Sequence, residues 1–161
     1  MNPYSRDRID TWVADYCESL RYASIPAAVK EHAAQILVAL LVCACEDEDL
    51  DPGSVSEKGL RRGLLEGVAS LQLPESIKPE VPGLCRSFLE ELDDQGRLGN
   101  GAGLGRYMRG LRSAYLEAAS ARPKPIVSVT RKSVATIRAR AGAAGSTRNA
   151  AWAFWTVAKT K

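Results

Sequence analysis

The stretch Ala33-Ala-Gln-Ile-Leu-Val-Ala-Leu-Leu-Val-Cys-Ala-Cys45 is the longest apolar run of this 161-residue chain, and it decides the fold. An acidic run, Glu46 to Asp51, follows it directly. As a helix, the apolar run is about 20 Å long, well short of the roughly 30 Å of a bilayer core. We therefore predict a buried helix from about Pro26 to Asp47 at the centre of a helical domain.

Apolar residues recur at helical spacing on both sides of this central helix. The first such stripe runs from Ile9 to Leu20 and includes Trp12, Val13 and Tyr16. The fold class predicted from these patterns is all-α, an irregular bundle of about five helices. Besides the central helix, the patterns place helices at about 5–21, 55–71, 84–96 and 104–119.

Two glycine patterns accompany these helices. Gly59, Gly63 and Gly67 repeat every four residues along the third helix, where each glycine costs up to about 1 kcal/mol. Close packing against a neighbouring helix explains that cost, and a helix that is simply weak is the alternative. The stretch 99–105 lacks the preceding strand and the glycine spacing of a dinucleotide-binding loop, so we interpret it as a flexible turn between helices.

Charge divides the chain near residue 122. Residues 1–121 hold 13 Lys and Arg against 19 Asp and Glu, whereas residues 122–161 hold nine basic residues and no acidic one. Pro123 and Pro125 do not allow a helix to continue across this point. We predict an α-helical domain over 1–121 and a basic tail over 122–161.

Few residues of the helical part are candidates for chemistry. The four cysteines fall within apolar helical patterns, and Cys43 and Cys45 point to different faces of one helix, so we expect reduced core thiols and no zinc. His32 is the single histidine and lies inside a helix. We therefore expect no catalytic, cofactor-binding or metal residue, no small-molecule substrate and no enzyme activity. The polar N-terminus has no apolar signal core, and we expect a cytoplasmic location without membrane contact.

Three arginines are the candidate interaction residues of the domain. Arg106, Arg109 and Arg112 recur at three-residue spacing beside the apolar face of the fifth helix. A solvated basic face is the ordinary interpretation of this pattern. The functional interpretation is a surface for phosphate or for an acidic partner.

The tail carries a motif one reading frame away. When the third base of each codon is joined to the first two bases of the next, permitted codons from Ser133/Val134 to Ala150/Ala151 spell GRNDPCPCGSGRKYKKCC. This string resembles the SEC-C zinc-binding motif, named for its place at the end of a preprotein translocase motor. A one-base deletion near Lys132 is the simplest account of it.

The frame shift removes the cysteines of that motif. They would arise across Arg138/Ala139, Arg140/Ala141, Asn149/Ala150 and Ala150/Ala151, where this chain has no thiolate to bind zinc. A short zinc module depends on its metal for folding energy, so we expect a disordered tail.

Part of the helical domain has a resemblance as well. Leu73-Pro-Glu75 and the stretch from Val81 to Leu92 resemble the domain that precedes the SEC-C motif in some uncharacterised bacterial proteins. The motif implies docking to protein or ribosomal partners in relatives that keep it. The leading hypothesis is a noncatalytic adaptor that has lost its zinc site. The alternative is a protein that binds RNA through its basic, aromatic tail.

Overall fold

The computed structural model describes residues 3–46 and 51–121, and within these ranges the chain is helical without a strand. The all-α prediction is therefore confirmed for the described part of the domain. The predicted tail over 122–161, with its expected disorder, lies outside the described residues. The α-helices are α1 (Pro3–Cys17), α2 (Leu20–Ala23), α3 (Ala27–Cys45), α4 (Glu57–Arg62), α5 (Val81–Asp94), α6 (Gly101–Gly110) and α7 (Arg112–Ser120).

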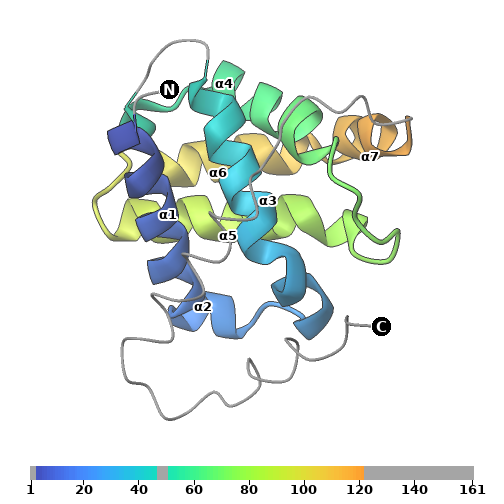
Figure 1. The fold of residues 1–161 in the computed structure, drawn as a ribbon, viewed down its shortest axis with the longest axis horizontal. Helices are drawn as coiled ribbons and strands as arrows, with labels where there is room; N and C mark the ends of the chain where they lie inside the picture. The colour runs from blue at the N-terminus through green and yellow to red at the C-terminus, as the bar shows by residue number, and fades with distance from the viewer. Residues whose placement is uncertain (1–2, 47–50, 122–161) are drawn as a thin grey trace, which may run out of the picture.

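Helix α3 is the centre of the domain, as its apolar sequence predicts. Twelve of its nineteen residues are buried, among them Ile36, Leu37, Leu40 and Leu41 with no exposed surface. It packs against α1, α4 and α5, and it crosses in front of the antiparallel pair α5 and α6 (Figure 1). By length and composition α3 is also apolar enough to cross a membrane. However, 67% of that window is buried in the domain, and a core helix passes the same test.

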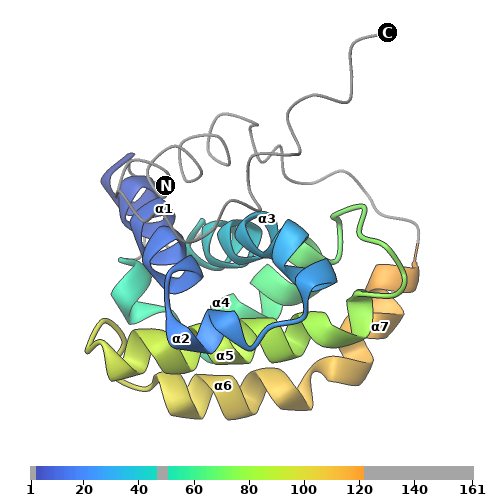
Figure 2. The same cartoon turned by 90° about the horizontal axis from the view of Figure 1, so that it is seen from below.

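The first predicted helix is two helices in the structure, which corrects the prediction of one continuous stripe to Leu20. Ser19 adopts an extended backbone (φ −75°, ψ 158°), and its hydroxyl accepts a hydrogen bond from the Tyr22 amide. This cap ends α1 and starts the short helix α2, which Figure 2 shows beside α5. Leu20 consequently turns outward and is 91% exposed instead of buried.

The glycine stripe packs on α3, which settles the alternatives left by the sequence in favour of close packing. A Cβ atom built on Gly59, Gly63 or Gly67 would lie 2.8, 2.3 or 2.8 Å from an atom of Ala44, Leu40 or Cys43 on α3. After Gly63 the helix widens into a π-turn, η2 (Gly63–Val68), marked by a hydrogen bond from Ala69 N to Leu64 O. The three glycines therefore allow the backbone of the α4–η2 segment to lie against that of α3.

The glycine-rich stretch at 99–105 is largely helix, which corrects its interpretation as a flexible turn. Helix α6 begins at Gly101, where an added Cβ would lie 2.3 Å from the Leu89 carbonyl oxygen. The glycines thus allow α6 to lie directly on α5. Helix α5 ends before Gly96, whose φ of 66° suits a residue without a side chain.

The predicted fifth helix is also interrupted. At Leu111 the amide bonds to the Met108 carbonyl three residues back, which tightens the turn between α6 and α7. Two short 3₁₀ turns complete the described fold, η1 (Pro52–Ser54) and η3 (Lys78–Glu80). The Lys78 ammonium group donates a hydrogen bond of 3.0 Å to the carbonyl oxygen of Ala119 in the last turn of α7. This bond links η3 to the end of α7.

Candidate functional site

The three arginines selected from the sequence all lie at the surface. Arg106 and Arg109 are exposed one turn apart on α6, and Arg112 is exposed across the Leu111 turn at the start of α7. The turn at Leu111 means that one straight helix does not carry all three. None of the three side chains makes an ion pair or hydrogen bond with another described residue.

Most other basic side chains of the described domain are engaged. Arg21 pairs with three carboxylates of α5, reaching Asp94 at 2.5 Å and Glu90 and Glu91 at 3.3 Å each. Arg97 reaches Asp15 on α1 at 2.5 Å. Within residues 3–46 and 51–121, five Lys and Arg side chains have neither an ion-pair nor a hydrogen-bond partner: Lys58, Arg61, Arg106, Arg109 and Arg112.

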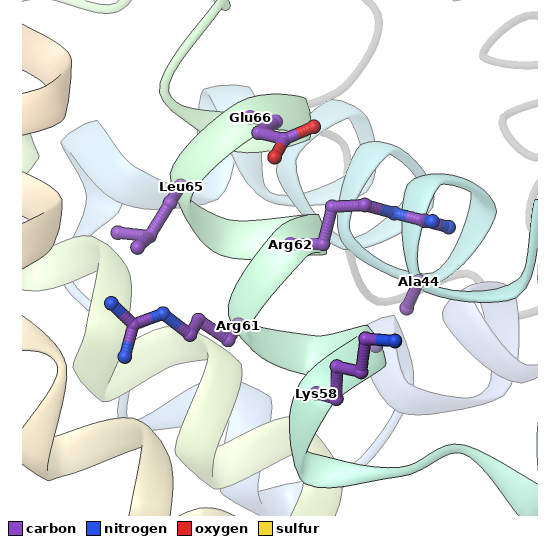
Figure 3. A pocket seen from close by; sticks show the side chains of 7 residues that line it. Ala44, Lys58, Arg61, Arg62, Leu65 and Glu66 are labelled. Atoms are coloured by element: carbon purple, nitrogen blue, oxygen red, sulfur yellow. The ribbon is translucent and has the colours of Figure 1, made fainter. Parts of the chain in front are cut away.

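Lys58 and Arg61 border a hollow of about 300 Å³ between the last turn of α3 and the α4–η2 segment (Figure 3). We call this the α3–α4 hollow. Both side chains are exposed, Leu65 is half-buried, and Glu66 is the one carboxylate among the lining residues. The hollow therefore combines apolar surface with an excess of positive charge. Its lining residues are Ala44, Lys58, Gly59, Arg61, Arg62, Leu65 and Glu66.

Arg62 holds one wall of the hollow in place. Its Nε donates to the Cys43 carbonyl at 3.0 Å, and its Nη2 donates to the same oxygen. The guanidinium group therefore sits at the carbonyl end of α3, where a positive charge compensates the partial negative charge of the helix terminus. Figure 3 shows this side chain extending along the last turn of α3, away from Leu65. Arg62 is thus structural, and Lys58 and Arg61 remain available to a ligand.

The four thiols of the described domain favour their neutral forms. Burial raises the pKa of Cys17 and Cys45 to about 11 and that of Cys85 to about 12. Burial also raises the pKa of Cys43, although the charge of Arg62 opposes the shift. A nucleophilic thiol needs a lowered pKa, so the raised pKa values favour a packing role for these cysteines.

Metal binding by the described residues lacks a donor set. No group of three or more His, Cys, Asp or Glu side chains in the described ranges is close enough to hold a metal ion. The expectation of no zinc at the shifted-frame motif rests on Arg, Ala and Asn at positions where zinc requires thiolates, and it stays a prediction. Those positions lie outside the described residues.

Sequence reasoning missed the α3–α4 hollow. Lys58 and Arg61 are three residues apart on one helix, which is a weak local signal for a shared face. The hollow itself depends on how α4 and η2 pack against α3, which the local sequence does not specify. Comparison of the chain with protein-family models, with curated proteins and with solved structures gave no match in any of the three.

Proposed function

We propose that this chain is a noncatalytic interaction protein of the bacterial, cytoplasmic SEC-C type, in which a change of reading frame has removed the zinc module and left the helical domain as the binding part. The supporting observation is the set of five uncommitted cations in a domain whose charge is net negative. In a domain with an excess of carboxylates, these five cations make no ion pair or hydrogen bond with another described residue. Such charges are available to an acidic partner.

The origin of the tail is tested by the gene. We expect nucleotides from the codon of Ser133 onward to spell the cysteine motif one frame away. Inserting one base near the codon of Lys132 should then give a protein that retains one zinc ion per chain after dialysis, measured by atomic emission. This chain should retain none. Codons incompatible with the motif would contradict the proposal.

The interaction function is tested by cross-linking at the arginine surface. A photoreactive amino acid at position 109 should yield protein adducts in cells that survive ribonuclease, with the same substitution at the exposed position 31 on α3 as the control for nonspecific labelling. Adducts that disappear after ribonuclease would contradict the adaptor proposal. They would support the alternative, an RNA-binding protein.

The RNA alternative makes a separate prediction about salt. Phosphate contacts release counterions, so RNA affinity through the basic tail falls steeply as salt rises. A single-stranded RNA oligonucleotide should then lose affinity when residues 122–161 are removed, provided circular dichroism shows the shortened chain to be helical. The adaptor proposal predicts little RNA affinity at physiological salt for either chain.

A further inference from the structure

We infer that the α3–α4 hollow is a docking site for an acidic protein segment that carries an apolar side chain. This inference rests on the proposed interaction function and assigns that function a site and a class of ligand. It starts from Lys58 and Arg61, two exposed cations on the same hollow without a carboxylate partner among the described residues. A hollow of about 300 Å³ is large enough for one side chain and its flanking backbone.

The chemistry of the lining favours an acidic segment over other ligands. Leu65 and Ala44 provide apolar surface. Figure 3 shows Arg61 on the same side of the α4–η2 segment as Leu65, and Lys58 on the side of Ala44. An apolar side chain of the partner would bury against Leu65, and carboxylates on either side of it would meet the two cations. Nucleic acid fits less well because the lining has no aromatic side chain on which a base would stack.

The backbone on both sides of the hollow is fixed before a ligand arrives. Arg62 ties α4 to the last turn of α3 through its bonds to the Cys43 carbonyl. The glycines at 59 and 63 bring the two helix backbones together along the same line. The π-turn of η2, a helix form found often at functional sites, carries Leu65 and Glu66. Because this backbone is already ordered, the loss of conformational entropy on binding is smaller.

The test is fluorescence anisotropy of the full chain with a fluorescein-labelled peptide of Glu-Leu-Glu repeats at low ionic strength, where charge contacts are least screened. We expect binding, weaker binding of the same peptide with Ser in place of Leu, and none with Lys in place of Glu. The double variant K58E/R61E should raise Kd about tenfold or more. The charge-conserving variant K58R/R61K should bind as the original chain does.

The competing basic surface is tested in the same assay. The variant R106E/R109E changes charge equally at exposed positions of α6, and a loss of peptide affinity confined to this variant would overturn the hollow as the site. Circular dichroism confirms that each variant is folded. Equal losses in both double variants would overturn the hollow as the site, because they would indicate binding to overall positive charge.

Other outcomes also overturn the inference. One is single-stranded RNA that binds through Lys58 and Arg61 while the peptide does not bind. A second is peptide binding that appears only after Asp47, Glu48 and Asp49 are neutralised, since the chain's own acidic run would then be the ligand. A third is no peptide binding at all. In each case the zinc and cross-linking tests of the proposed function stand on their own.

Discussion

Replacing Gly63 by alanine should destabilise the domain, although alanine is the better helix former. An ideal Cβ at this position would lie 2.3 Å from the backbone oxygen of Leu40 and 3.3 Å from its Cδ1. A carbon and an oxygen that are not bonded need more than 3 Å, and a backbone carbonyl inside α3 cannot rotate away. The α4–η2 segment must therefore move off α3 or distort.

The size of the effect follows from two opposing terms. Overpacking of a tight contact costs about 1–3 kcal/mol and occasionally more. Alanine recovers up to about 1 kcal/mol of helix propensity relative to glycine. A 2.3 Å contact with a backbone carbonyl lies at the upper end of the overpacking range, so we expect a net loss of about 2 kcal/mol in the free energy of unfolding. Gly110 provides the matched control because it also lies in a helix, its φ is not positive, and an added Cβ would meet no atom within 4 Å. Gly110→Ala should be neutral or stabilise by up to about 1 kcal/mol.

Urea unfolding followed by far-ultraviolet circular dichroism measures both variants. For a slope of about 2 kcal/mol per molar urea, the two midpoints should differ by roughly 1 M or more. A urea midpoint of Gly63→Ala equal to or above that of Gly110→Ala would refute the predicted clash with α3. A change in slope would instead indicate that the variant has altered the compactness of one of the two states.

Three further predictions concern buried polar groups. Tyr115→Phe should keep or raise the thermal midpoint, because the buried Tyr115 hydroxyl has no hydrogen-bond partner in the described structure. Tyr16→Phe should instead lower the free energy of unfolding by about 1 kcal/mol, because it removes a 2.9 Å hydrogen bond to a serine of α5. Lys78→Met should cost about 1–3 kcal/mol in urea unfolding, because the last turn of α7 loses its buried donor. Stability should be constant up to about pH 8 and fall above about pH 9, because Cys17 and Cys85 bind their protons more tightly folded, with pKa values of about 11 and 12, than unfolded. A urea midpoint that rises between about pH 8 and pH 10 would contradict this sign.

Local sequence was sufficient wherever burial alone decides the structure. The run from Ala33 to Cys45 is too apolar to face water, and α3 is the buried central helix. The four-residue glycine period left two alternatives, a close helix contact or a weak helix, because it places three positions without side chains on one side of a helix. The partner of that contact was not predictable, since it depends on the path of the whole chain around α3.

Local sequence did not predict the structure correctly where a single capping hydrogen bond or a residue far away in the chain determines it. The apolar period predicted burial of Leu20, but the Ser19 cap starts a new helix and turns that side chain outward. The α3–α4 hollow could not be predicted from the sequence for a related reason. Arg21 bonds to Glu90, 69 residues away, and Arg97 bonds to Asp15, 82 residues away. Which cations remain unpaired is therefore a property of the tertiary structure, and Lys58 and Arg61 look ordinary in the sequence.

The unequal pairing of cations gives a last prediction. Arg21→Glu would place a carboxylate among Glu90, Glu91 and Asp94 and remove three ion pairs, so the domain should lose about 1 kcal/mol or more even though these groups are partly exposed. Arg106→Glu removes no described contact and should stay within about 0.5 kcal/mol.

Both variants change the net charge equally, so a general electrostatic effect would move them together. Urea midpoints measured at low and at high salt separate these cases. Screening should reduce the Arg21→Glu deficit and leave Arg106→Glu unchanged. Equal deficits would mean that Arg106 has a partner in solution. Its charge would then be no more available to a ligand than that of Arg21, and the case for α6–α7 as an interaction surface would fail.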